Sequence, residues 1–377
     1  MRRNALLIQI FVIACILFTL ADFTTNAQVF RDYYNQEVRV MKEPDELSLS
    51  VNASTFFNNN EFFGTDVEGY TLTGAFLQPV VSYSLAENLS FGAGIHLLKY
   101  NGRDEFAQTL PLFRIDYKVS SNFGITMGSF NGGESFRLPE PMYTFENHFT
   151  SLVNNGIRLD FHGDRIRSLT WLNWEHFILP NDTLQEQLTV GSSNDFTLLK
   201  RNGSTLTIPA YLVVHHQGGQ INITDKPVIT TWNIGGGFLL SHSFSGEKHG
   251  EVFLNPLVFF NSNDESDTNG FAWYPQIGMR IDPFSLTAGY FHGRSFDTVY
   301  GEPLFFSPGQ FMSGTSAEEV KSLLTFKAGF GKKITPSSSV LLRFEGYYDT
   351  MISKLQYTYG LHILINENFT LKAFERR

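Results

Sequence analysis

The residues best suited to chemistry are the histidines and their acidic neighbours. A hydrolase needs a nucleophile activated by a base that lies in line with it. His215 and His216 are adjacent in a predicted strand, as are Glu175 and His176, so the members of each pair point to opposite faces. The sequence holds neither a Gly-x-Ser-x-Gly nor a His-Glu-x-x-His motif. We therefore expect no enzymatic activity and no catalytic residue.

Metal binding has one candidate segment. The acidic stretch Asn263–Gly270 offers carboxylates and a glycine that a calcium loop could use, but it lacks the terminal bidentate glutamate. A polar hairpin tip of this kind is usually only solvated. The single cysteine, Cys15, lies in the apolar N-terminal segment, which excludes disulfides and cysteine-ligated metals from the rest of the chain. We expect no metal site and no cofactor.

Isolated charges of both signs recur on the polar face of predicted strands. Such charges would line a wet lumen and tune its ion selectivity. Alternatively, they pair into a static network that fills the interior. The predicted lumen charges are Arg114, Asp116, Lys118, Arg158, Asp160, Lys327, Arg343, Glu345 and Asp349.

Alternation with a period of two residues predicts the strands that carry these charges. Leu355, Tyr357 and Tyr359 begin one apolar face, while Gln356 and Thr358 begin the opposite face. The 377 residues are 15% aromatic and only 17% charged, with 32 glycines, as is typical of all-β chains. A soluble sandwich also alternates. Aromatic residues at the ends of apolar faces and mixed small and charged residues opposite them favour a transmembrane barrel.

The N-terminus predicts export. Arg2 and Arg3 precede the apolar run Ala5–Leu20, and Thr25–Ala27 fits cleavage before Gln28. Val12–Cys15 also resembles a lipobox, although the residues that follow Cys15 stay apolar. We therefore assign residues 1–27 to a signal peptide, 28–45 to a periplasmic segment and 46–377 to an outer-membrane barrel.

Eight tight turns predict about 16 strands, within a range of 14 to 18. The last of these turns would create a seventeenth strand at Phe369–Arg377, whereas single-chain bacterial barrels have even strand numbers. Either one strand near the N-terminus is miscounted, or Phe369–Arg377 is a short closing element. The turns lie at Ala86–Asn88, Ser120–Asn122, His162–Asp164, Arg201–Gly203, Ser245–Glu247, Asp282–Pro283, Thr335–Ser337 and Asn366–Asn368.

Two connections are unusually long, at Asn131–Thr150 and Arg294–Val320. Loops of this length are uncommon unless they are functional. Either loop could fold into the lumen and constrict it, or could lie exposed on the surface. Within the second loop, Ser316–Glu319 could open one helical turn. The residues predicted to form a constriction are Glu134, Arg137, Glu140, Phe305 and Phe306.

The signal peptide, the turn and strand at Leu85–Gly92 and the aromatic-rich alternation resemble porin-like outer-membrane β-barrel proteins of Gram-negative bacteria, above all those of the Bacteroidetes. The resemblance spans nearly the whole mature chain. It implies contact with outer-membrane lipid and folding by the barrel assembly machinery. Members usually end in an aromatic residue, whereas here Phe374 is followed by three charged residues.

Our functional expectation is a porin-like channel for passive diffusion of small solutes. The alternatives are a filled barrel that binds partners through its long loops, and a channel for hydrophobic compounds. Removal of Arg2, Arg3 and Asp22 with the signal leaves 26 basic and 36 acidic residues. The resulting net charge of −10 argues against nucleic acid as a partner and favours a mild cation preference. Nothing in the sequence demands a homo-oligomer, which stays open.

Overall fold

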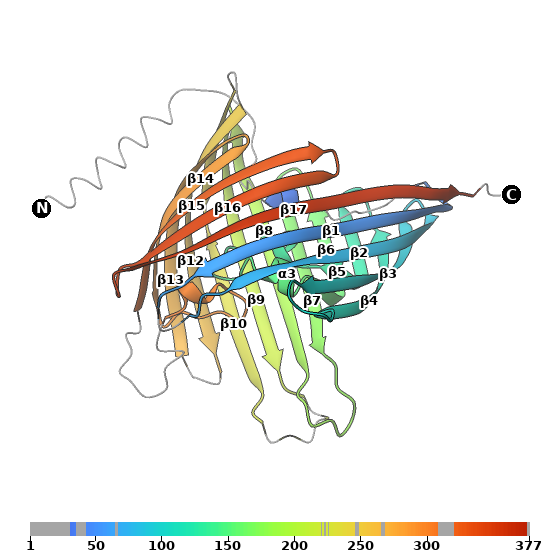
Figure 1. Ribbon diagram of the computed structural model, residues 1–377, viewed down its shortest axis with the longest axis horizontal. Coiled ribbons are helices and arrows are strands. Elements are labelled where there is room, and N and C mark those ends of the chain that lie inside the picture. The colour runs from blue at the N-terminus through green and yellow to red at the C-terminus, as the bar shows by residue number, and fades with distance from the viewer. Residues whose placement is uncertain are drawn as a thin grey trace, which may run out of the picture.

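A computed structural model gives the structure of the protein. It describes residues 31–34, 43–64, 67–219, 221, 224, 226–245, 249–264, 268–307 and 320–374. These residues form one closed antiparallel sheet with short helical turns inside it (Figure 1). None of the helices among them is long and apolar enough to cross a membrane.

The sheet contains seventeen strand segments. In chain order they are β1 Glu46–Glu61, β2 Thr71–Ala86, β3 Leu89–Tyr100, β4 Gln108–Lys118, β5 Phe123–Asn131, β6 Val153–His162, β7 Ile166–His176, β8 Gln187–Arg201, β9 Ser204–Gln217, β10 Ile229–Gly237, β11 Leu239–Ser245, β12 His249–Asn263, β13 Thr268–Ile281, β14 Phe284–Arg294, β15 Val320–Thr335, β16 Ser338–Asp349 and β17 Lys354–Ala373.

β10 and β11 are two halves of one strand. Both pair with β9 on one side and β12 on the other, and the register continues unchanged across Phe238. Prolines at Pro209 in β9 and Pro256 in β12 lie beside this interruption and have no N–H group to donate to the ladder. The barrel therefore has sixteen strands, which confirms the predicted number.

Pairing of β1 with β17 closes the barrel. Their antiparallel ladder runs from Glu46 opposite Ala373 to Glu61 opposite Tyr357. An even number of antiparallel strands lets the first and last strands pair in this way, so no edge remains unpaired. Both barrel termini consequently lie at the end that carries the tight turns.

Six of the eight predicted turns join consecutive strands, namely those at residues 86–88, 120–122, 162–164, 201–203, 282–283 and 335–337. The predicted turn at Ser245–Glu247 falls between β11 and β12, but residues 246–248 lie outside the described residues. We call this end of the barrel the turn end and the opposite end the loop end.

The eighth predicted turn, at Asn366–Asn368, is wrong. β17 continues through it to Ala373 and pairs there with β1, so residues 369–373 belong to β17 and not to a separate strand, while residues 375–377 lie outside the described residues. β16 begins at Ser338 opposite Ile365, and the Asn366 N–H donates to the Ser337 carbonyl at 2.8 Å. Asn366–Asn368 thus lies at the rim of the barrel, where β17 extends beyond β16. These residues are polar, and so resemble a turn in composition, because they follow the apolar part of the strand.

Side chains alternate between the two faces of the wall as predicted. Leu361, Ile363 and Ile365 are exposed on the outer face of β17, while His362 and Leu364 are buried on the inner face. The interior holds four short helical turns: α2 at Arg31–Tyr34, η1 at Gly133–Phe136, α3 at Asn147–Thr150 and η2 at Pro303–Phe305. The lumen is therefore largely occupied by the chain's own segments.

A charge on the outer face should destabilise the barrel. Phe326 is exposed near the middle of β15, so Phe326→Arg should cost about 2–4 kcal/mol of unfolding free energy in lipid. Glu105→Arg, in the exposed loop 101–107, places the same charge in water and should change stability little. Equilibrium urea unfolding in vesicles, followed by heat-modifiable gel migration, measures both. Equal stabilities would show that Phe326 does not face lipid.

Candidate functional site

The two long loops fold into the barrel rather than away from it. In the first, which we call the constriction loop (residues 132–152), Phe136, Met142 and Phe149 are almost completely buried. In the second, the described part of the partner loop (residues 295–307), Phe296 and Phe305 are fully buried. Burial of these aromatic side chains against the inner wall offsets the entropy lost by ordering the loops.

Phe136 anchors the constriction loop to the wall. Its ring stacks on Trp171 of β7 with centroids 3.9 Å apart and an interplanar angle of 5°. Such pairs contribute about 0.5–1.5 kcal/mol beyond their buried area. Gly191 on β8 makes room for the indole, because a Cβ atom there would come within 2.0 Å of Trp171.

Arg137 makes a second anchor beside Phe136. It adopts a left-handed backbone conformation (φ 56°) that turns its side chain towards β8. The guanidinium donates to the Asp195 carboxylate at 2.5 Å and to the Ser193 carbonyl at 2.9 Å. Charge-assisted hydrogen bonds of this kind are stronger than neutral ones. Arg137 therefore holds the loop in place and is buried beneath it.

The two loops are joined across the lumen. Tyr143 and Tyr300 form a parallel β-bridge, and the Thr144 N–H donates to the Tyr300 carbonyl at 2.6 Å. The Glu302 N–H donates to the Glu140 carbonyl at 3.0 Å, and the Thr144 hydroxyl donates to the Glu302 carboxylate at 2.7 Å. We call this junction of residues 140–146 with 300–302 the loop partition.

The loop partition separates two cavities. The turn-side cavity, of about 230 Å³, is lined by Tyr143 and Phe145 among others. The loop-side cavity, of about 210 Å³, is lined by the alternate residues Thr144 and Glu146. The extended segment 143–146 thus contributes its odd-numbered side chains to one cavity and its even-numbered ones to the other. At this point one backbone segment divides the cavities.

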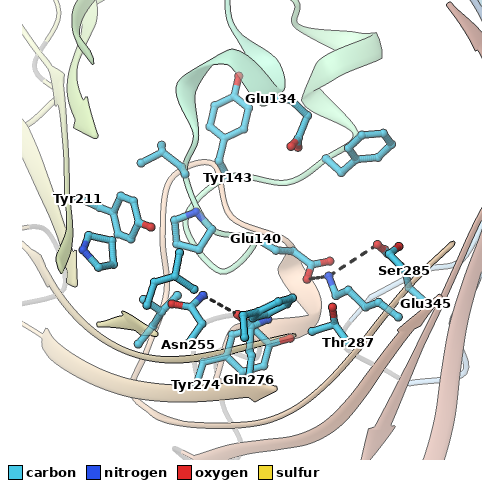
Figure 2. Close-up of a pocket in the computed structure, with 18 of the residues that line it drawn as sticks. Glu134, Glu140, Tyr143, Tyr211, Asn255, Tyr274, Gln276, Ser285, Thr287 and Glu345 are labelled. Atoms are coloured by element: carbon cyan, nitrogen blue, oxygen red, sulfur yellow. Dashed lines mark hydrogen bonds and ion pairs between the residues drawn. The ribbon is translucent and has the colours of Figure 1, made fainter. Parts of the chain in front are cut away.

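The turn-side cavity contains a group of paired charges. Figure 2 shows Glu140 and Glu345 on one side of the cavity, with Tyr211 and Asn255 on the other. The Lys327 ammonium contacts the Glu140 carboxylate and lies 3.7 Å from Glu345. The Arg343 guanidinium pairs with Glu345 at 2.5 Å and lies over the Phe145 ring, 3.3 Å from its centroid. These basic groups are therefore balanced by carboxylates.

The loop-side cavity is acidic. Glu68, Glu146 and Glu302 line it, together with Tyr70 and Tyr300, and its lining within the described residues includes no Lys or Arg. Burial, with a smaller contribution from the charge of Glu140, raises the pKa of Glu302 to about 8. Burial also raises the pKa of Glu146. The negative charge of this cavity therefore increases as the pH rises through 8.

Three of the nine predicted lumen charges, Lys327, Arg343 and Glu345, line the turn-side cavity. None of the nine is among the described residues that line the loop-side cavity. Most of the others form pairs on the inner wall. Arg114 pairs with Asp116 at 2.7 Å, Arg158 with Asp160 at 2.9 Å, and Asp349 with Lys321 at 2.8 Å. Lys118 is exposed near the turn end of β4.

The predicted constriction residues take different positions. Glu134 and Glu140 line the turn-side cavity, whereas Arg137 lies beneath the loop. Phe305 packs edge-on against Phe291, 4.9 Å between centroids, and lines neither described cavity. Phe306 is half-buried beside it. The predicted helical turn at Ser316–Glu319 lies outside the described residues, as does part of the acidic stretch Asn263–Gly270.

Comparison with known families assigns the chain. Residues 39–374 match the family model described as lipid A 3′-O-deacylase-type. The chain belongs to this family. The match covers the whole barrel, from before β1 to the residue that follows β17. Comparison with curated protein sequences gives no match.

Solved structures show the same fold at low sequence identity. This member of the lipid A 3′-O-deacylase-type family overlaps Pseudomonas aeruginosa OpdO with a TM-score of 0.51 at 11% identity, over 88% of this chain and 99% of that one. P. aeruginosa OprD overlaps this chain with a TM-score of 0.52 at 8% identity, over 90% of this chain and 98% of that one. Acinetobacter baumannii OccAB3 overlaps it with a TM-score of 0.50 at 10% identity, over 86% of this chain and 99% of that one. The fold is that of a porin-like outer-membrane β-barrel protein.

One polar cluster of this family member was missed by reasoning from the sequence. The Thr189 hydroxyl donates to Glu175 at 2.5 Å and lies 3.0 Å from His215 Nδ1. The Tyr300 hydroxyl lies 2.6 Å from that of Thr189 and also donates to Glu175. The residues come from β7, β8, β9 and the partner loop, so only the register between strands brings them together.

The cluster positions the partner loop rather than forming a triad. Thr189 and Glu175 both lie near the same ring nitrogen of His215, at 3.0 and 3.7 Å, so the imidazole does not link a nucleophile to a carboxylate. Thr189 is only 2% exposed. Among the described residues, no group of three or more His, Cys, Asp or Glu side chains could hold a metal ion.

Removal of the Arg137 anchor should loosen the constriction loop. Arg137→Met keeps the apolar stem but deletes the bonds to Asp195 and Ser193, worth about 1.5 kcal/mol, so amides in residues 132–152 should exchange roughly tenfold faster. Arg103→Met, at an exposed arginine of loop 101–107, should leave the exchange unchanged. Hydrogen–deuterium exchange with mass spectrometry distinguishes the two. Equal rates in all three proteins would refute the anchoring role.

Proposed function

We propose that this protein is an outer-membrane channel for passive diffusion of small polar solutes, with a preference for cations. The observation that carries the proposal is the pair of cavities, each with charged groups in its lining, divided by a loop partition only one backbone segment thick. Sixteen-stranded barrels are wide enough for an aqueous path, which inward loops then narrow. Solutes pass when the contact between Thr144 and Glu302 gives way.

The cation preference rests on the loop-side cavity. Its three glutamates line the entrance from the loop end, where those that are ionised raise the local concentration of cations. The basic side chains of the turn-side cavity are paired with carboxylates and add no net positive charge. Glu134, Glu140, Asp195 and Glu345 outnumber Lys327 and Arg343 among its lining residues.

The structure gives less support to a path for hydrophobic compounds. Phe305 is buried against Phe291 and Tyr274 and lines neither of the cavities in the described part of the chain. The turn-side cavity presents Asn255, Gln276 and Ser285 besides its charges, so its apolar residues, such as Leu239 and Phe253, do not form a continuous apolar lining. A filled barrel that acts through its loops is the remaining alternative, since aromatic clusters occupy much of the lumen.

The family name raises deacylation of lipid A as a second candidate. We infer that this chain does not catalyse it. Its hydroxyl, histidine and carboxylate cluster lies inside the barrel, whereas lipid acyl chains contact the outer face, and the cluster lacks the relay of a hydrolase. Incubation with lipid A followed by mass spectrometry tests this inference. Loss of an acyl chain that is abolished in His215→Ala would overturn it.

We propose also that the chain reaches the outer membrane through cleavage of a signal peptide before Gln28 and folds with the barrel assembly machinery. Residues 28–377 are therefore the mature protein to refold and insert into planar bilayers. Reproducible ohmic steps with a cation-selective reversal potential are expected. A folded barrel without steps would exclude a constitutively open channel and favour the filled-barrel alternative.

Cation selectivity should rise with pH through Glu302. Because its folded-state pKa is raised to about 8, Glu302 is mostly neutral at pH 7 and mostly charged at pH 9. One added charge near the path should increase the cation-to-anion permeability ratio about two- to fourfold. Reversal potentials in a KCl gradient at both pH values measure this.

Glu302→Gln should abolish that increase. Glu68→Gln removes a carboxyl group from the same cavity and should lower selectivity while preserving the rise with pH. An identical rise in the wild type and Glu302→Gln would assign the titration to another group.

A further inference from the structure

Part of the N-terminal segment lies inside the barrel, although the sequence suggests a periplasmic segment for residues 28–45. Tyr33 and Tyr34 of α2 are each 8% exposed and belong to an aromatic cluster with Phe56, Phe149 and Leu341. Because Tyr33 contacts β15 close to its turn end, α2 occupies the turn-end side of the lumen.

Tyr33 fits a hollow in the wall. Its hydroxyl donates to the Gly331 carbonyl at 3.0 Å. A Cβ atom at Gly331 would come within 2.8 Å of the Tyr33 ring, so only glycine leaves room for it. The Tyr33 ring therefore fills the space that a side chain at position 331 of β15 would otherwise occupy.

Tyr34 contacts both the wall and the constriction loop. Its hydroxyl lies 2.5 Å from Nδ1 of His362 on β17. Its ring meets those of Phe145 and His148 edge-on, with centroids 5.1 and 4.7 Å away. Phe145 also lines the turn-side cavity, beneath the Arg343 guanidinium. Tyr34 thus supports residues 145–149 of the constriction loop.

We propose that α2 is an intramolecular plug, in which Tyr33 and Tyr34 dock against Gly331, His362 and residues 145–149 and hold the constriction loop closed. A tethered segment needs only weak contacts to stay bound, because its effective concentration at the site is high. Release of the plug vacates the space beside the turn-side cavity and frees residues 145–150 to move. The effect on conductance rests on the proposed channel function, whereas the docking itself does not.

The test removes the two rings from the mature chain. In Tyr33→Ala/Tyr34→Ala, amides of residues 145–150 should exchange about tenfold faster, as expected when an aromatic anchor is lost. Single-channel conductance should rise at the same time. Tyr33→Phe/Tyr34→Phe keeps both rings and should show a smaller change. Heat-modifiable migration verifies that each variant folds.

A variant on the wall provides an independent check. Gly331→Ala should displace Tyr33 and reproduce the faster exchange without altering the N-terminal segment. Gly346→Ala is the matched control, since its Cβ atom would meet no atom of another residue closer than 3.8 Å. A synthetic peptide of residues 28–37, added from the turn end, should restore a low conductance to the double alanine variant. The same peptide with both tyrosines replaced by alanine should not.

The outcomes separate the plug from the channel. Exchange rates that match the wild type in both the double alanine variant and Gly331→Ala would overturn the plug. Faster exchange without conductance in any variant would support docking and reject the channel function. Faster exchange with unchanged conductance would show that the segment docks without obstructing the path, which also overturns the plug.

Discussion

Pairing of β1 with β17 is the constraint on which the rest of the structure depends. It closes the sheet, leaves no unpaired strand edge in the membrane and thereby creates an interior. A barrel of sixteen strands is too wide for wall side chains alone to fill. The space that closure creates is what the constriction loop, the partner loop and α2 occupy.

Two kinds of contact place these inserted segments. Aromatic rings pack against the inner wall, as at Phe136 on Trp171 and Phe305 against Phe291. Ion pairs and hydrogen bonds then set the orientation, as at Arg137 with Asp195 and Lys327 with Glu140. Isolated charges in the interior would be costly, and their pairing with carboxylates satisfies them in place. Most of the charges that the sequence suggested for the lumen pair with one another on the inner wall, whereas Lys327 and Arg343 also contact the constriction loop.

The charged groups inside the barrel are the basis of the proposed function. One cavity lies on each side of the loop partition, and the loop-side cavity is the more acidic of the two. In the proposed channel, the contact between the two loops, with α2 packed beside it, controls the path without any movement of the wall. Membership of the lipid A 3′-O-deacylase-type family does not require a hydrolase, since a fold can carry several functions.

The sequence by itself determined the closed antiparallel barrel, most of its tight turns and the faces of its strands. These features depend on local patterns, namely alternation with period two and turn residues between strands. The same locality explains the one false turn, because Asn366–Asn368 has turn-like composition but lies at a rim where β17 extends past β16. Only the tertiary structure decided the positions of the long loops, the cluster of Glu175, Thr189, His215 and Tyr300, and the contact of Tyr34 with His362. These depend on the register between strands and on contacts between residues as many as 328 positions apart, which no local pattern encodes.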